Sequence, residues 1–140
     1  MSHSGFYINI NNKYGVLIDP FIKSNPLADF DYKNHLITHI FVTHAHGDHL
    51  GCAIEISKST KAPIYCIFEL ANYCSKMGAM GVGMNLGGEI KFEFGSALFL
   101  NAQHSSSCPD GTYGGCASSI LFNINGNKIF HLGDTSLHSD

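Results

Sequence analysis

Three histidines and one aspartate fall within six consecutive residues of the stretch "THAHGDH": His44, His46, Asp48 and His49. Imidazole and carboxylate groups are ligands for zinc, manganese and iron, and a set without thiolate is typical of catalytic rather than structural metal sites. A single loop histidine is more often solvated, and Asp48 alone could be a helix cap. Four such residues in one short segment therefore indicate that they bind a metal together.

Two more residues of ligand type follow predicted strands further along the chain. His104 comes after the apolar run "ALFLNAQ", and Asp134 comes after "KIFHLG". Each alone would more often be a turn residue, but strand ends are where side chains can converge on a ligand. We expect both to join the histidine cluster along a single edge of one sheet.

The cluster is predicted to lie where a strand ends and a helix begins. Residues 38–43 form a β-branched and aromatic run that predicts a buried strand. In the turn that follows, Gly47 is expected to supply backbone angles that other residues resist. Asp48 is placed as the N-cap of a helix that continues through Ser57. The first two histidines would then face one way, and Asp48 and the third histidine another, so one segment could serve two metal ions.

The remaining elements are predicted from hydrophobic patterning. Strands are expected over "GFYINI" and "GVLIDP", which form a hairpin, and over "APIYCI", "EIKFEF", "ALFLNAQ", "ASSILFNI" and "KIFHLG". Residues 70–77 have helical spacing, with Gly78 as the C-cap. The glycine-rich stretch 78–88 has no phosphate-binding pattern and is expected to be a mobile loop. This order predicts one domain over residues 1–140, with a mixed sheet and helices on one face.

Composition bounds the class of protein. Of 140 residues, 44% are hydrophobic and 14% charged, which is typical of a globular domain. The net charge is −3 and the chain has no arginine, which argues against a nucleic-acid partner. No apolar run is long enough for a membrane span and the first residues lack a signal-like segment, so we expect a cytoplasmic protein. Five cysteines without CxxC spacing favour buried reduced thiols over a disulfide framework or a cysteine zinc site.

Four motifs together resemble the metallo-β-lactamase superfamily. "THAHGDH" is similar to its HxHxDH signature, "IDPF" to its first motif, "QHSS" to its third histidine and "GDT" to its bridging aspartate. "DPFIKSNP", "MNLGG", "HSSS" and "HLGDTSL" resemble a subgroup of uncharacterised metal-dependent hydrolases related to sugar-lactone hydrolases. The resemblance covers residues 3–140. It implies an αββα sandwich of two similar halves, of which this chain is mainly the N-terminal one.

The resemblance also implies a role for each residue of the cluster. His44, His46 and His104 would hold a first metal ion, Asp48 and His49 would hold a second, and Asp134 would bridge the two. The implied cofactors are two divalent ions, with zinc as the first choice and manganese as the alternative. Asp19 matches a carboxylate that supports the histidine loop from behind, although a turn residue would also fit there. His3 stands where members of the family have a histidine close to the metal cleft, but it could equally be a histidine of a flexible terminus. The other histidines match nothing and are interpreted as structural or solvated: His35, His39, His131 and His138.

The expected activity is hydrolysis of a small-molecule substrate. Two neighbouring cations lower the pKa of a shared water, and the metal-bound hydroxide would attack an ester, lactone or phosphoester centre. Asp48 is the expected catalytic residue, because it could orient the water or accept its proton. Residues 105–107 are serines but lack a GxSxG elbow, so a serine hydrolase is the weaker rival.

Two other hypotheses remain open from the sequence. A di-iron redox protein of the same fold would typically have glutamate in place of His46. In the second hypothesis the chain is truncated at both ends, because members of the family begin earlier and continue past "GDTSL" with a layer that supplies a last histidine. Such a chain would bind one metal, or associate with a second copy or a missing C-terminal half, without turnover.

Overall fold

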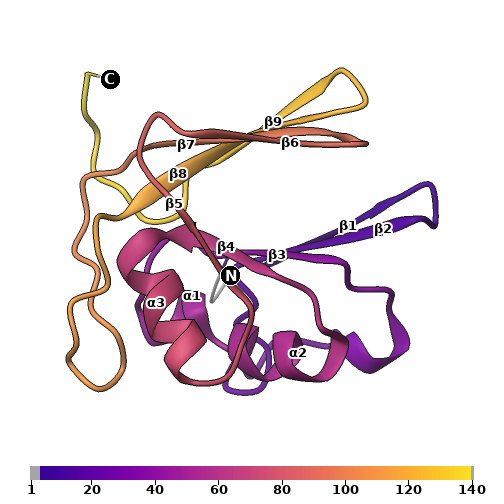
Figure 1. Cartoon of the computed structure of the whole chain (residues 1–140), viewed down its shortest axis with the longest axis horizontal. Coiled ribbons are helices and arrows are strands. Elements are labelled where there is room, and N and C mark those ends of the chain that lie inside the picture. The colour runs from indigo at the N-terminus through magenta and orange to yellow at the C-terminus, as the bar shows by residue number, and fades with distance from the viewer. Residues whose placement is uncertain (1–3, 140) are drawn as a thin grey trace.

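The computed structural model describes residues 4–139, and its strands form two sheets (Figure 1). The first sheet has five strands in the order β1-β2-β3-β4-β5, with bounds Phe6–Ile10, Tyr14–Ile18, His39–Phe41, Ile64–Ile67 and Gly81–Met84. The strands β1 and β2 form the predicted antiparallel hairpin, and all other neighbours are parallel. The sheet is therefore mixed, as predicted.

The second sheet has four antiparallel strands in chain order. They are β6 Glu89–Phe92, β7 Gly95–Asn101, β8 Ser118–Ile124 and β9 Asn127–His131. All four strands were predicted from hydrophobic patterning. The prediction of one sheet is wrong, because hydrophobic patterning finds strands but does not determine which strands pair with each other.

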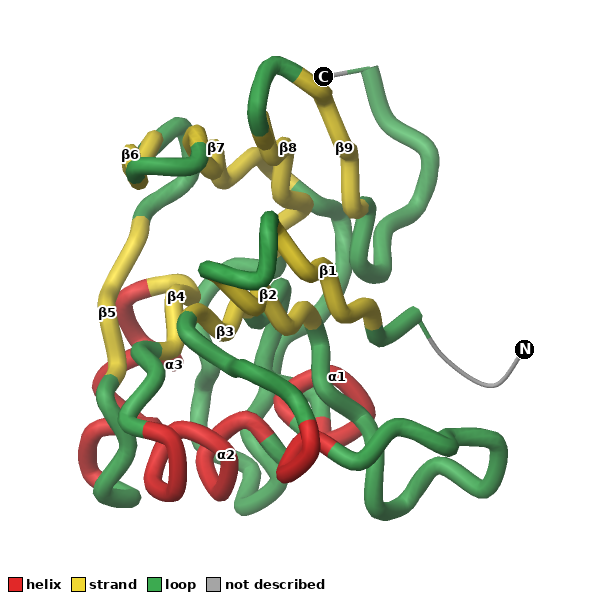
Figure 2. Tube along the Cα trace, turned by 90° about the vertical axis from the view of Figure 1, so that its right-hand side faces the viewer, coloured by secondary structure: helices red, strands yellow, loops and turns green. Residues whose placement is uncertain are grey.

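Helices cover only the outer face of the first sheet, and the second sheet lies against its inner face (Figures 1 and 2). The helices are α1 Gly47–Leu50, α2 Ala53–Thr60 and α3 Phe68–Lys76, with a 3-10 turn at Tyr32–Asn34. Successive side chains of β3 point to opposite faces of the sheet, which explains this layering. Ile40 packs among the helices, whereas Phe41 packs between the sheets. Ring centroids of Phe41 and Phe122 lie 4.9 Å apart, which joins the sheets directly below the end of β3.

The predicted continuous helix after the histidines is wrong, because Gly51 breaks it. Gly51 has φ +44°, and a Cβ there would lie 2.4 Å from the carbonyl oxygen of Pro20. The Cys52 amide donates to the same oxygen at 2.9 Å. Asp48 lies in the first turn of α1 rather than at its N-cap. Gly47 does not have the positive φ expected of it.

Part of the glycine-rich stretch, Gly81–Met84, forms the strand β5, whereas the whole stretch was predicted to be a loop. A Cβ on Gly81 would lie 2.1 Å from the carbonyl oxygen of Ala71, and one on Gly83 would lie 2.8 Å from the Phe68 ring. These glycines let β5 lie directly against α3 while pairing with β4. Their role is close packing.

All five cysteines are free, and only Cys116 is exposed. The prediction of reduced thiols is thus confirmed for four buried residues. Within residues 4–139, no helix is both long enough and apolar enough to cross a membrane.

Candidate metal centre

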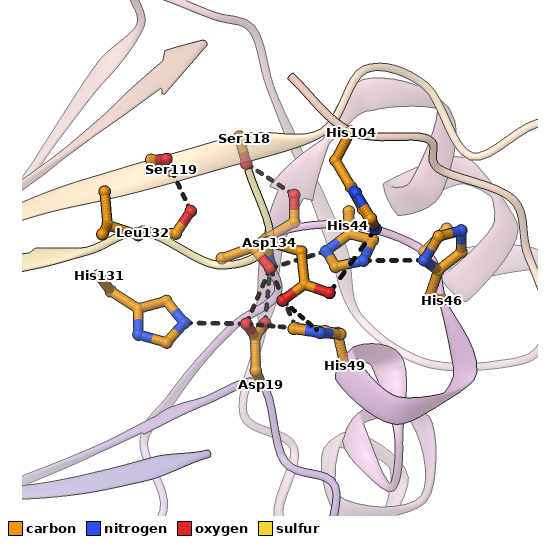
Figure 3. Close-up of polar contacts among 12 residues, drawn as sticks. Asp19, His44, His46, His49, His104, Ser118, Ser119, His131, Leu132 and Asp134 are labelled. Atoms are coloured by element: carbon orange, nitrogen blue, oxygen red, sulfur yellow. Dashed lines mark hydrogen bonds and ion pairs between the residues drawn. The ribbon is translucent and has the colours of Figure 1, made fainter. Parts of the chain in front are cut away.

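The predicted ligands come from three places in the chain that meet between the two sheets (Figure 3). His44 and His46 lie in the turn after β3, and His49 lies in α1. His104 follows β7, and Asp134 follows β9. The prediction of a single edge of one sheet is wrong, because the last two residues follow strands of the second sheet.

The first group of ligand atoms belongs to three histidines. One ring nitrogen each of His44, His46 and His104 lies within 4.8 Å of the other two. Nε2 of His44 is 3.1 Å from Nδ1 of His46. His44 is buried, His46 is half-buried and His104 is exposed, so the group opens toward solvent on the His104 side.

A second group shares one histidine with the first. Ligand atoms of His44, His49 and Asp134 also lie within 4.8 Å of one another. Asp134 places Oδ1 3.3 Å from Nε2 of His49 and Oδ2 3.6 Å from Nε2 of His104. Its carboxylate therefore spans the two groups (Figure 3).

The ring nitrogens that face away from the groups are held by other polar atoms. Thr43 Oγ1 donates to Asp19 Oδ2 at 2.8 Å, which leaves the hydroxyl free to accept the Nδ1–H of His44 at 3.1 Å. His49 Nδ1 donates to Asp19 Oδ2 at 2.9 Å. Ser105 Oγ lies 3.3 Å from Nε2 of His46. Each of these three rings is thus oriented with its other nitrogen toward the groups, as metal-binding histidines usually are.

Electrostatics move the pKa values of the two central histidines in opposite directions. Burial, together with the nearby His49 ring, lowers the pKa of His44 to about 4, so its Nε2 lone pair is available at neutral pH. Burial opposes protonation of His49 as well, but the hydrogen bond and charge of Asp19, with the charge of Asp134, raise its pKa. Burial would raise the pKa of Asp19, yet hydrogen bonds from His131 and His49 hold it well below the usual range. Asp19 is therefore a buried anion.

Two predicted residues lie outside these groups. Asp48 is exposed in the first turn of α1 and belongs to neither group, although its charge contributes to the raised pKa of His49. His3 lies outside the described residues.

His131 was interpreted as structural or solvated, but it contacts the support of the site. Its Nε2 lies 2.9 Å from Asp19 Oδ2, and the side chain is buried. The signal is in the register of β9: His131 pairs with Ile120, an inward residue of β8. The sequence alone does not predict this register, because it does not show which strands pair.

A cavity of about 410 Å³ adjoins the first group at His104. Its polar lining includes Asn101, the serines at 105–107, Tyr113 and Cys116, and no charged side chain. A small neutral polar group could enter beside His104.

Comparison with known proteins identifies relatives along nearly the whole chain. The sequence model described as "Beta-lactamase superfamily domain" matches residues 14–140. A UPF0173 metal-dependent hydrolase of Thermus thermophilus is 42% identical over 140 residues, which are 100% of this chain and 62% of that protein. One of Enterococcus faecalis is 44% identical over 141 residues, covering 99% of this chain and 63% of that protein.

A solved structure supports the same relationship. Igni18, described as a novel metallo hydrolase from Ignicoccus hospitalis, has a TM-score of 0.83 at 32% identity, over 99% of this chain and 60% of that one. The chain thus spans less than two thirds of the length of these relatives.

Proposed function

The chain belongs to the beta-lactamase superfamily, and from that membership we propose that its histidine cluster is the metal centre of a metal-dependent hydrolase. The predicted fold class is confirmed: a helical layer and two sheets of the metallo-β-lactamase αββα sandwich. The relatives from Thermus thermophilus and Enterococcus faecalis are named metal-dependent hydrolases, which supports the activity.

The observation that carries the proposal is the position of Asp134 between the two groups of ligand atoms. A carboxylate whose two oxygens face different histidines can bridge two cations. We assign the first position to His44, His46 and His104, the second to Asp48 and His49, and the bridge to Asp134. Nitrogen and oxygen donors without thiolate suit zinc, and manganese is the alternative.

Divalent ions in these positions would supply a water of lowered pKa and a Lewis acid for an ester, lactone or phosphoester substrate. The chain's own contribution is orientation and proton transfer. Neutral His44 offers Nε2 without losing a proton, whereas the raised pKa of His49 makes protonation compete more strongly with metal binding there. Asp48 is exposed, so its carboxylate could take a proton from the attacking water and pass it to solvent. The cavity beside His104 would hold the substrate's polar end.

Metal analysis tests the first part of the proposal. The purified chain, loaded with Zn²⁺ or Mn²⁺ and dialysed, is expected to retain about two equivalents, and His46→Ala should retain fewer. His35→Gln is the matched control, because His35 packs against Tyr7 and Phe30 rather than against the cluster. Retention of less than about half an equivalent of metal by the parent chain would contradict the proposal.

An activity panel tests the second part. Lactones, phosphodiesters and thioesters are assayed with each metal, and hydrolysis of at least one class is expected to depend on the ion and on His46. A chain that retains both equivalents but hydrolyses nothing in the panel would favour metal binding without turnover. That result would contradict hydrolysis by this chain.

A further inference from the structure

His131 is the only described residue that the second sheet contributes to the Asp19 carboxylate. It ends β9, and its ring points inward and is 7% exposed. Nε2 lies 2.9 Å from Oδ2 of Asp19, which follows β2 in the first sheet. The Phe6 ring packs edge-on against the imidazole at 5.6 Å. The contact thus bridges the two sheets directly behind the metal centre (Figure 3).

The Asp19 carboxylate faces four hydrogen-bond donors. Oδ1 accepts the Thr43 amide at 2.8 Å, and Oδ2 receives the Thr43 hydroxyl at 2.8 Å. Nδ1 of His49 and Nε2 of His131 complete the set, each 2.9 Å from Oδ2. Oδ2 thus faces three donors and Oδ1 faces one, so four donors hold the carboxylate. Three of these donors lie in residues 43–49, and His131 is the fourth.

This arrangement reaches both groups of ligand atoms. Asp19 accepts the Nδ1–H of His49 directly, which leaves Nε2 toward Asp134. Asp19 also accepts the Thr43 hydroxyl proton, so that hydroxyl must accept from Nδ1 of His44. One carboxylate therefore sets the proton position of two imidazoles. The position of the Asp19 carboxylate decides both, because rotation of its side chain would move the shared acceptor oxygen away from the Thr43 hydroxyl and from Nδ1 of His49.

We propose that His131 is a positioning residue that locks the Asp19 carboxylate and thereby holds Nε2 of His49 and Nε2 of His44 toward the metal positions. The inference rests on the proposed function for its consequence, but its geometry is a property of the metal-free chain. A merely structural His131 would contribute to stability and leave the tautomers of His44 and His49 unchanged.

The test compares variants that differ only in what they offer Asp19. His131→Phe keeps a ring and removes the donor, whereas His131→Gln keeps an amide donor at similar reach. His131→Asn carries the same amide one bond shorter, so Gln against Asn remains informative if the Phe variant does not fold. His39→Phe is the control, because His39 packs among Phe92, Phe94 and Tyr65, away from Asp19.

The first measurement is ¹⁵N NMR of the imidazoles in the metal-free chain. At a pH above the His49 transition, where both rings are neutral, we expect His44 and His49 to be Nδ1–H tautomers in the parent and His131→Gln chains, and mixtures in His131→Phe and His131→Asn. The second measurement is chelator competition with Zn²⁺. Affinity for the weaker equivalent should fall about 10- to 100-fold in the Phe and Asn variants and recover in Gln, as for other residues that support metal ligands.

Failure of this inference and failure of the proposed function give different results. Unchanged tautomers in folded His131→Phe or His131→Asn, or equal metal affinities of the Gln and Asn variants, would overturn the role of His131. If the parent chain binds no Zn²⁺ while its tautomers follow the substitutions, the positioning role stands and the metal centre does not.

Discussion

Oδ2 of Asp19 lies 2.9 Å from Nδ1 of His49, so a fully buried carboxylate stands directly behind a residue of the metal centre. The opposite nitrogen of the same ring, Nε2, lies 3.3 Å from Asp134. The imidazole is thus held between two carboxylates, one inaccessible to solvent and one half-buried. The inner carboxylate can fix the orientation of the ring without competing for the metal, because it is fully buried behind the ring and hydrogen-bonded to its Nδ1.

Asp19→Asn should destabilise the metal-free chain by about 3 kcal/mol. The four donors that face the buried carboxylate would lose its negative charge, and the NH₂ group of asparagine would face some of them as another donor. The folded pKa of Asp19 is lowered below the unfolded value of about 4, so its stabilisation is present above that pH and is lost as pH falls below it. Urea unfolding should therefore show a large difference between parent and variant at pH 6 and a smaller one at pH 3. Asp29→Asn, on the surface, is the control and should change neither value.

His44 and His49 should titrate far apart in the metal-free chain. The pKa of His44 is lowered to about 4, so this ring should stay neutral throughout the range in which ordinary imidazoles gain a proton, about pH 6.5. The pKa of His49 is raised, so it should gain its proton above that range as pH falls. ¹H–¹⁵N NMR titration measures both, and Asp134→Asn should move the His49 transition to lower pH. Coincident transitions near pH 6.5 would contradict the described electrostatics.

The candidate metal ligands could be predicted from the sequence, because histidine and aspartate are unusual residues to find clustered directly after an apolar strand. The segment from His44 to His49 follows an apolar strand, and no core or solvated turn requires so many imidazoles. The strands of both sheets except β5 were also predictable, since each has an apolar run ended by a turn. His131 was missed because its meaning depends on Asp19, which lies 112 residues away and in the other sheet.

The errors have the same physical origin. Pairing between strands decides whether one sheet or two sheets form, and local patterning does not report pairing. A glycine can provide unusual backbone angles or allow another segment to pack closely against the backbone, and the sequence alone does not distinguish these two roles. At Gly81 the close approach of Ala71 decides the matter, and this contact is visible only in the fold.

Gly51→Ala should destabilise the chain by at least about 2 kcal/mol, because a side chain there would be strained at φ +44° and would overlap the Pro20 carbonyl. Gly47→Ala is the matched control: its Cβ would meet only Pro109, at 3.9 Å. Thermal unfolding of the two variants measures the difference. Equal melting temperatures would show that the break between α1 and α2 does not require glycine.

Removing the carboxylate of Asp48 and removing that of Asp134 should have different effects on metal content and on kcat. Asp134→Asn weakens a carboxylate that faces both His49 and His104, so we expect the loaded chain to lose about one equivalent of metal, and activity with it. Asp48 is exposed and in neither group of ligand atoms, so Asp48→Asn should retain more metal while kcat falls about 100-fold if its carboxylate accepts the proton. Metal content and kcat measured on the same preparations separate the two roles. If Asp48→Asn loses metal in proportion to activity, Asp48 acts only as a ligand of the second position and not also as the proton acceptor.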